Sequence, residues 1–479
     1  MTTARTRRWL ARTGSVLVAA AVAAGTALPA AEARPSGETA RVSEGLNGAQ
    51  PDGFSYALGL SLDGRAALFS SSATNLVPND TNGVTDLFVR NLWTKRIERV
   101  SVADDGSQLN AETAEGTISG DGRYVTFSTT ATNAVPGQPH HESDVFVRDL
   151  WTGHTELVTA GGTTSTDDQT IRNAFSPSLS WDGRYVTYSS DRTDLAPGVH
   201  RGKFNIYVTD RWTHTTRLVT TGADGGTADN NSFRPTISAD GSTIGFTSRA
   251  GNLLPPDQPA ATATDAPTGL SDTAEAAEAA APARPAAGAE PRLTGPRYYP
   301  FFVWNAHTGR TSAGSIDETG AFRGTGLDNR ISLDGRYAIY SLPVFGGGDA
   351  PHRTRLDVYA RELATGKLTK VSATPPGTTT TKSSSNGVMT LDDRWVYFDS
   401  DADNLVPGDT NQQTDVFRRD LRTGHTELVS RAQDGSQSTG ASYGPAIDAL
   451  GLTTIFTAED GTLVPGDTNH ASDVFLRRR

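Results

Sequence analysis

The sequence DTNQQTDVFRRDLRTGHTELVS, residues 409–430, recurs along the chain in altered copies. Earlier copies are DTNGVTDLFVRNLWTKRIERVS at 80–101 and QPHHESDVFVRDLWTGHTELVT at 138–159, and a shortened copy, DTNHASDVFLRRR, occupies 467–479. In each full copy an alternating apolar and polar run leads through a short turn into a second such run, which is typical of a β-hairpin. A chain built from these copies is expected to fold as an array of repeats.

A second motif, Asp-Gly-Arg or a close variant, fixes the repeat length. It begins at Asp63, Asp121, Asp182, Asp240, Asp334 and Asp392, with a degenerate copy at Leu450-Gly451. The steps are 58, 61, 58, 94, 58 and 58 residues, so one step is 36 residues too long. That step contains an Ala/Pro-rich tract, at about 256–295, with almost no large apolar residue. Such a composition cannot offset the entropy of ordering, so a flexible insertion within the fourth repeat is expected.

Each repeat is predicted to contain four short strands. In the first copy they are expected at Leu58–Ser61, Ala66–Ser71, Asp86–Asn91 and Ile97–Val102. The turn between the last two strands usually contains Thr-Gly, as at Thr423-Gly424, where glycine supplies the positive φ that a tight hairpin needs. About seven such units without a helical segment predict an all-β fold, a seven-bladed β-propeller of four-stranded antiparallel blades.

The two ends of the chain predict how the propeller closes. The seventh repeat ends at Arg479 and lacks its fourth strand. The missing strand is at the other end, because RVSEGLNGAQPDGFSYALGLSLDGR from Arg41 aligns without a gap on RVSVADDGSQLNAETAEGTISGDGR from Arg99. Residues 39–43 are therefore expected to pair with 473–477 and complete the last blade, which removes an open sheet edge.

The first 33 residues have the features of a cleavable signal peptide. Four arginines precede a short apolar run, Val16 to Leu28, and Ala31-Glu32-Ala33 is a cleavage signal. The chain is thus expected to be secreted, through the general or, given Arg7-Arg8, the twin-arginine route. No other segment is apolar enough to span a membrane. A net charge of −11 argues against nucleic acid as a partner, and the absence of cysteine excludes disulfides.

The repeats resemble a known family. Their cores, such as SLDGRAALFSS, SWDGRYVTYSS and SDVFVRDL, are similar to the WD40-like (PD40) repeats of TolB-like β-propellers. The resemblance covers residues 39–479 outside the insertion. It implies the propeller fold but only a broad range of functions, because related propellers serve as periplasmic binding proteins, as gating domains of peptidases and as stand-alone secreted modules.

Propeller geometry identifies a candidate ligand site. The loops between the second and third strands, and between one repeat and the next, are long and emerge on one face, where the central channel opens. Aligned positions at the start of the first strands place polar and aromatic residues at this mouth: Tyr56, Glu115, Phe175, Phe233, Arg234, Asp328, Asn386 and Tyr443. They are interpreted as a site for a small molecule or peptide. The alternative is that they are solvated loop residues, with the aromatic rings packed between blades.

Three of the long loops share the pattern D-T-N-x-x-x-D. Closely spaced carboxylate and amide oxygens suit a hard cation such as Ca²⁺. Because Asp and Asn are also common turn residues, and Asp144 and Asp357 recur at the last position without the preceding D-T-N, a structural role is the alternative. The candidate metal ligands are Asp80, Asn82, Asp86, Asp409, Asn411, Asp415, Asp467, Asn469 and Asp473.

Catalytic motifs are weak in this sequence. Gly440-Ala441-Ser442-Tyr443-Gly444 matches G-x-S-x-G, but a strand is expected after it where a nucleophile elbow needs a helix. No catalytic residue is assigned, and Ca²⁺ is the one cofactor considered. The interpretation is a secreted, monomeric binding module for an extracellular protein, peptide or glycan. An extracellular hydrolase or lyase using carboxylates at the channel mouth, and a structural envelope-associated protein, are the alternatives.

Overall fold

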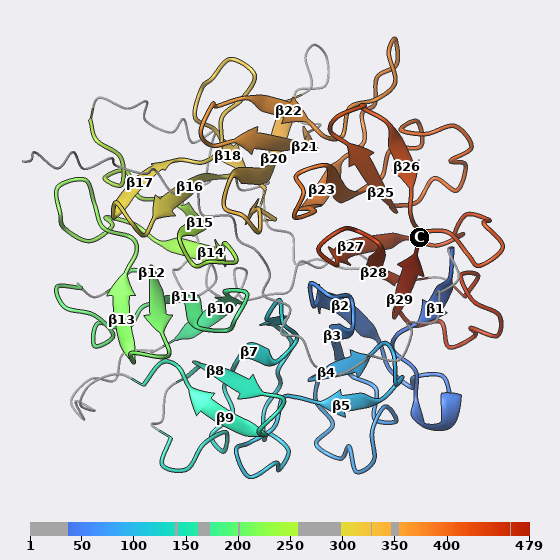
Figure 1. Cartoon of the computed structure of the whole chain (residues 1–479), viewed down its shortest axis with the longest axis horizontal. Helices are drawn as coiled ribbons and strands as arrows, with labels where there is room; N and C mark the ends of the chain where they lie inside the picture. Colours follow the sequence, from blue (N-terminus) through green and yellow to red (C-terminus); the bar gives the residue numbers. More distant parts are fainter. Residues whose placement is uncertain are drawn as a thin grey trace, which may run out of the picture. The chain divides into compact units, whose positions relative to one another are not determined.

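The computed structural model describes residues 37–138, 142–160, 173–199, 202–256, 298–326, 328–345, 354–459 and 461–479. The expected signal peptide and almost all of the insertion expected at about 256–295 lie outside these residues. The described part of the chain forms seven antiparallel sheets arranged as blades around a central axis (Figure 1). The all-β, seven-bladed propeller predicted from the repeats is therefore confirmed.

Each blade contains four strands, here called a to d from the axis outward, in sequence order. Blade 1 consists of β2 (Ser55–Leu60), β3 (Ala66–Ser71), β4 (Asp86–Asn91) and β5 (Ile97–Arg99). Blade 2 consists of β6 (Gly116–Ile118), β7 (Tyr124–Thr129), β8 (Asp144–Asp149) and β9 (His154–Leu157). Blade 3 consists of β10 (Ala174–Leu179), β11 (Tyr185–Ser190), β12 (Asn205–Asp210) and β13 (Thr215–Leu218).

The remaining blades follow the same order. Blade 4 contains β14 (Ser232–Ile237), β15 (Thr243–Ser248), β16 (Tyr299–Asn305) and β17 (Arg310–Ala313), with the short β18 (Gly324–Thr325) also paired to β16. Blade 5 contains β19 (Arg330–Ile331), β20 (Tyr337–Phe345), β21 (Thr354–Glu362) and β22 (Leu368–Lys370). Blade 6 contains β23 (Ser384–Met389), β24 (Trp395–Ser400), β25 (Asp415–Asp420) and β26 (Thr426–Leu428).

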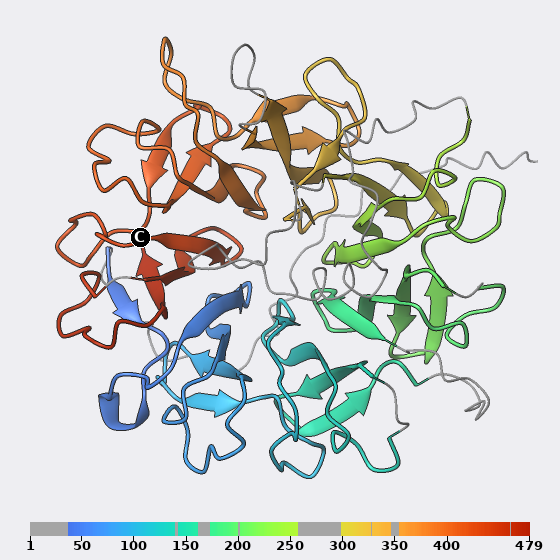
Figure 2. The same ribbon diagram turned by 180° about the vertical axis from the view of Figure 1, so that it is seen from behind.

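Blade 7 confirms the predicted closure. Its strands a to c are β27 (Ser442–Ile447), β28 (Thr453–Ala458) and β29 (Asp473–Arg478), and strand d is β1 (Thr39–Arg41) from the other end of the propeller. In both views of the ribbon the blue β1 lies beside the red β29 (Figures 1 and 2). The pairing continues past β1, because the Val42 amide donates to the Val474 carbonyl at 2.6 Å.

Strand d is shorter in the structure than the sequence predicted. β5 ends at Arg99, whereas the alternating pattern suggested a strand as far as Val102. The reason is that Val102 leaves the sheet and forms an isolated bridge with Gln108 in the loop to the next blade. The same bridge recurs in three other d–a loops, where it joins Thr221 to Thr227, Ile316 to Phe322 and Arg431 to Gln437.

The core lies within and between the blades. In blade 1 the rings of Phe69 on strand b and Phe88 on strand c stack with centroids 5.7 Å apart, and both are fully buried. This pair recurs because the repeat places an aromatic residue at the same position of both strands. Its counterparts are Phe127 and Phe146, Tyr188 and Tyr207, Phe246 and Phe302, Tyr340 and Tyr359, Phe398 and Phe417, and Phe456 and Phe475.

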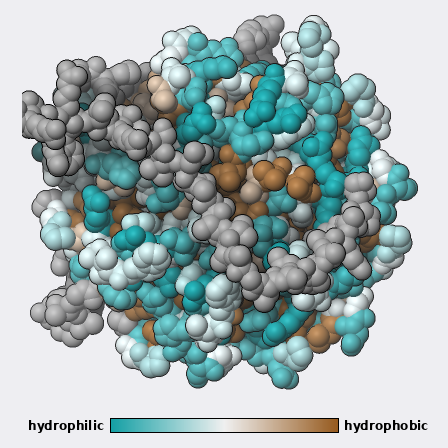
Figure 3. Space-filling model, viewed as in Figure 1, coloured by the Kyte–Doolittle hydropathy of each residue, from teal (hydrophilic) through white to brown (hydrophobic). Residues whose placement is uncertain are grey.

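The tight a–b turns of neighbouring blades are joined by backbone hydrogen bonds around the axis. The Leu62 amide of blade 1 donates to the Gly120 carbonyl of blade 2 at 2.9 Å, and the Ala449 amide of blade 7 donates to the Leu62 carbonyl of blade 1 at 3.0 Å. Gly120 also leaves room for the indole of Trp181, since a Cβ at Gly120 would lie 2.0 Å from its Cδ1. Leu391 and Leu450, in the a–b turns of blades 6 and 7, are exposed. Figure 3 shows a small group of apolar atoms near the centre of the face in view.

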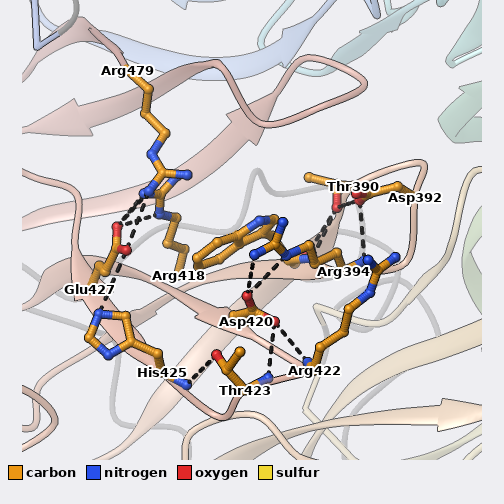
Figure 4. Close-up of polar contacts among 11 residues, drawn as sticks. Thr390, Asp392, Arg394, Arg418, Asp420, Arg422, Thr423, His425, Glu427 and Arg479 are labelled. Atoms are coloured by element: carbon orange, nitrogen blue, oxygen red, sulfur yellow. Dashed lines mark hydrogen bonds and ion pairs between the residues drawn. The ribbon is translucent and has the colours of Figure 1, made fainter.

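An arginine-aspartate pair ties the a–b turn to the c–d turn within a blade. In blade 6 the Arg394 guanidinium donates to the Asp420 carboxylate, which also accepts from the amides of Arg422 and Thr423 (Figure 4). These donors lower the pKa of Asp420, although burial opposes them. Equivalent pairs are Arg123 with Asp149 and Arg184 with Asp210. In blades 2, 3 and 6 the turns that define the repeat in sequence are thus also joined to each other by an ion pair.

Candidate functional site

The central channel contains a cavity of about 270 Å³ at the level of the strands a. Six of the eight residues predicted at the channel mouth line it: Tyr56, Glu115, Arg234, Asp328, Asn386 and Tyr443. They come from blades 1, 2, 4, 5, 6 and 7. The structure brings together side chains up to 387 positions apart, because each lies just before an innermost strand or among its first three residues.

The other two predicted residues, Phe175 and Phe233, do not line the cavity. Each is only 4% exposed, and both pack against Phe204, with ring centroids 5.2 Å and 5.6 Å away. The three rings form their own buried cluster at blades 3 and 4. This corrects their placement at the mouth, and it agrees with the alternative that aromatic rings at these positions pack between blades.

A β-bulge explains why neighbouring positions in strand a have such different surroundings. In β10 the register with β11 shifts between Phe175 and Ser178, and Ser176 adopts a left-handed φ of 51°. The same irregularity occurs in β14, β23 and β27, at Arg234, Asn386 and Gly444. A bulge inserts one extra residue and redirects the backbone locally. Its amide can therefore leave the blade's own ladder and meet a side chain of the preceding blade.

The carboxylates of the channel accept hydrogen bonds from these bulge amides. Glu115 in blade 2 accepts from the Ser176 amide of blade 3 at 2.7 Å and from the Ser128 hydroxyl. Asp328 in blade 5 accepts from the Asn386 amide of blade 6 and from the Ser341 hydroxyl. Both acidic residues were predicted from the sequence as ligand contacts, and the structure shows that both also fasten one blade to the next.

A third carboxylate, Asp399, was missed by the sequence reasoning. It lies on strand b of blade 6, is 3% exposed, and accepts from the Gly444 amide of blade 7 at 3.0 Å. It also accepts from the Asn386 side chain at 2.7 Å. Burial raises the pKa of both Asp399 and Glu115, against the effect of their hydrogen bonds. The sequence does distinguish Asp399, because the equivalent position of strand b is Ser or Thr in the other six blades.

Arg330 is the second residue that the sequence reasoning missed. It begins β19, lines the cavity and has an exposed side chain. It pairs with Ile339 of strand b, and the residues in the same register in the other blades are small or aliphatic: Gly59, Thr117, Ser178, Thr236, Val388 and Ala446. Desolvation by the surrounding blades lowers the pKa of Arg330, although Asp328 and Asp399 oppose the shift.

The three D-T-N loops have similar polar contacts. In each, the Asn side-chain amide donates to the Asp that opens strand c: Asn82 to Asp86 at 3.0 Å, Asn411 to Asp415 at 2.8 Å and Asn469 to Asp473 at 3.2 Å. The same Asp accepts from a Ser hydroxyl next to strand d, as Asp415 does from Ser430 at 2.6 Å. These bonds join strands c and d of one blade.

Other donors complete these loops. Arg99 contacts Asp80 and Asp86 at 3.5 and 3.4 Å, and Arg41 contacts Asp467 and Asp473 at 2.8 and 3.4 Å. In the remaining loop, which begins at Asp409, the Gln437 side chain donates to Asp409 and Asp415. Among the described residues, no group of three or more His, Asp or Glu side chains is arranged to hold a metal ion. These contacts favour the structural role, and the assignment of Ca²⁺ stays a prediction.

The G-x-S-x-G motif has no nucleophile elbow. Ser442 begins β27, the innermost strand of blade 7, and Gly444 is its bulge residue. The chain continues as a strand where the elbow requires a helix. As expected, this match has no catalytic meaning. In the part of the chain that the structure describes, no helix has the length and apolar character needed to cross a membrane.

No family model and no curated protein matches this chain. Among solved structures it is similar to oligogalacturonate lyase from Vibrio parahaemolyticus, with a TM-score of 0.51 and 11% identity over 93% of this chain and 97% of that one. The β-propeller domain of the Trilobed protease from Pyrococcus furiosus gives 0.46 and 11% over 88% and 93%. TolB from Acinetobacter baumannii gives 0.33 and 13% over 82% and 76%.

At these identities the similarity shows the fold and not the chemistry. The propeller expected from the repeats agrees with it. The chain is a seven-bladed β-propeller, consistent with the TolB-like (PD40) propellers that its repeats resemble.

Proposed function

We propose that this protein is an exported β-propeller that binds a ligand at the long-loop end of its central channel. The observation that carries the proposal is the wall of the 270 Å³ cavity. Five polar or aromatic side chains from five blades surround this one space: Tyr56, Tyr443, Arg234, Arg330 and Asn386. A concave site with aromatic surface and a few polar groups is the usual form of a small-molecule site. A small molecule, or the end of a peptide or glycan, would fit this volume. Export rests on the signal peptide predicted at residues 1–33.

Binding is preferred to catalysis because the channel carboxylates are already engaged. Glu115, Asp328 and Asp399 each accept two or more hydrogen bonds from neighbouring residues. A general acid or base needs an atom within reach of the substrate's proton. A hydrolase or lyase that uses these carboxylates is the second candidate, since all three lie at or beside the same cavity.

The proposal can be tested by filling the channel. Ser178 lines the cavity and pairs with Thr187 in the strand, so Ser178→Tyr would place a ring in the open space. Ala364→Tyr is the matched control, because Ala364 is exposed at a c–d turn where blades 1 to 3 carry tryptophan. Neutral sugars, short peptides and small organic acids would be screened by thermal shift. We expect a ligand that stabilises the natural protein and Ala364→Tyr but not Ser178→Tyr. Equal stabilisation of both variants by every active compound would contradict channel binding.

A further inference from the structure

Arg330 projects into the channel at a level where the other six blades leave space. The residues in its register are Gly59, Thr117, Ser178, Thr236, Val388 and Ala446, none of them charged. Arg330 is therefore the one charged side chain of this layer among the described residues. Its side chain is exposed, although it begins an innermost strand of the propeller.

The guanidinium has no partner among the described residues. It donates no hydrogen bond and forms no ion pair within 4 Å there. The two carboxylates that act on the pKa of Arg330 are Asp328 and Asp399. Asp328 accepts from Ser341 and Asn386, and Asp399 accepts from Ser385, Asn386 and Gly444. Both carboxylates thus accept hydrogen bonds from other residues and neither forms an ion pair with Arg330, so the planar N–H donors of Arg330 are left for a molecule in the channel.

Hydroxyl groups of neighbouring blades line the same layer. The Thr117 hydroxyl oxygen is buried and makes no hydrogen bond. Thr236 accepts from the Ile331 amide at 3.2 Å, and this leaves its own proton available for donation. Ser178 lines the cavity as well. One guanidinium and several hydroxyl donors form a set that matches an oxyanion, since arginine binds planar carboxylates with two parallel hydrogen bonds and also binds phosphate.

We propose that the channel recognises a ligand through an oxyanion group, a carboxylate or a phosphate, which is bound by Arg330 with the hydroxyls of Thr117, Ser178 and Thr236 around it. This proposal rests on the proposed function and names the chemical class of its ligand. Tyr56 and Tyr443 line the cavity too, and they would contact the uncharged part of the same ligand.

The test uses the chain from Gly37 onward and matched pairs of probes. Acetate is compared with acetamide, glucuronate with glucose, and inorganic phosphate with chloride, all at one ionic strength, by calorimetry and thermal shift. We expect acetate, glucuronate or phosphate to bind, while the other member of the same pair, which is neutral or a simple halide, does not. Binding of acetate or glucuronate identifies the recognised group as a carboxylate, and binding of inorganic phosphate identifies it as a phosphate.

Substitutions connect binding to the residue. Arg330→Gln should weaken the binding of that anion 10- to 100-fold, which is typical for the loss of hydrogen bonds to a charged group. Arg330→Lys should weaken it less, because the charge stays while the planar fork is lost. Arg310→Gln is the matched control, since Arg310 is exposed at a c–d turn. Melting curves of the variants without ligand report whether each is folded.

The outcomes separate this inference from the proposed function. If Arg330→Gln and Arg310→Gln bind the anion equally well, the assignment to Arg330 is wrong. If neutral compounds stabilise the natural protein but not Ser178→Tyr, and no anion binds, the channel is a ligand site without the oxyanion requirement. If no compound of either kind depends on Ser178 or Arg330, both proposals fail.

Discussion

Thr39 lies directly opposite Arg477 in the sheet of blade 7, although 438 residues separate them in the chain. Their contact is reinforced because the Arg477 guanidinium donates to the Thr39 hydroxyl at 2.8 Å. A few residues later Ser43 donates to the buried Asp473 at 2.7 Å. One strand therefore connects both ends of the propeller and covers an edge of β29 that would otherwise be open.

A chain that begins at Leu46 should lose much of the stability of the propeller. It lacks β1 and the fully buried Val42, whose burial alone contributes roughly 2 kcal/mol. We expect a lower and broader thermal transition, measured by circular dichroism at 218 nm or by calorimetry. A chain that begins at Gly37 is the control. The same melting curve for both chains would show that β1 does not hold blade 7 closed.

Asp415→Asn should reduce the pH dependence of stability. Burial, more than any other cause, raises the pKa of Asp415 to about 6, whereas the unfolded value is near 3.8. The folded state then binds this proton more tightly than the unfolded chain does. The stabilisation is complete below pH 4 and is lost as pH rises through about 6, by at most about 3 kcal/mol.

Urea unfolding at several pH values between 4 and 7.5 measures this effect. The slope of the unfolding free energy against pH should become less negative in Asp415→Asn, whatever the variant's stability at one pH. Asn205 holds the same place in blade 3 and accepts from Thr220 at 2.9 Å, so asparagine is compatible with this position. The exposed Asp403→Asn is the control. Identical slopes in the natural protein and Asp415→Asn would contradict the shifted pKa.

Gly245 and Phe301 form a size-matched pair in blade 4. A Cβ at Gly245 would lie 2.3 Å from the ring of Phe301 and 2.7 Å from Ile331. In blade 7 the equivalent residues are Ile455 and Val474, so the bulk lies on the other strand. Gly245→Ile should destabilise the protein by about 1–3 kcal/mol or more through overpacking, and Phe301→Val by a few kcal/mol through a cavity.

The double variant should recover part of the loss, with a coupling free energy of about 1–3 kcal/mol in a double-mutant cycle. Chemical denaturation of the four proteins gives this value. Ile244→Val combined with Phe301→Val is a suitable comparison, because it only removes volume. If the two effects at Gly245 and Phe301 simply add, the pair is not complementary.

Much of the fold could be predicted because the repeat is regular. The closure of blade 7 followed from one alignment, since Arg41 and Arg99 begin stretches that match at the repeat length. The site was predicted less completely because bulges control it. Phe175 immediately precedes the left-handed Ser176, and a pattern of alternating residues does not reveal which neighbour is buried. Arg330 and Asp399 were missed because their places in the channel depend on register with strand b and on contacts between blades.

Deleting residues 258–291 should leave the propeller folded. β15 and β16, which flank this segment, pair in continuous register from Thr243 with Asn305 to Thr247 with Phe301. Changing the length of a surface connection costs little closure entropy. We expect a melting temperature within a few degrees of the natural protein. Loss of the cooperative transition would show that the Ala/Pro-rich segment contributes to the fold.

The calcium prediction depends on the D-T-N loops and can be tested loop by loop. A cation bound only by the folded state would raise stability by about 2.7 kcal/mol per site at a hundredfold excess over its Kd. In the described residues the Asp409 loop is the one of the three whose carboxylates form no ion pair with arginine, whereas Arg99 and Arg41 hold the other two. If calcium binds, Asp409→Ala should therefore remove more of the stabilisation than Asp80→Ala or Asp467→Ala. Melting curves in millimolar calcium and in chelator measure this directly, and the two arginine-paired loops are expected to give no shift. If the natural protein melts identically in both solutions, D-T-N is a turn motif that joins strands c and d and has no cation.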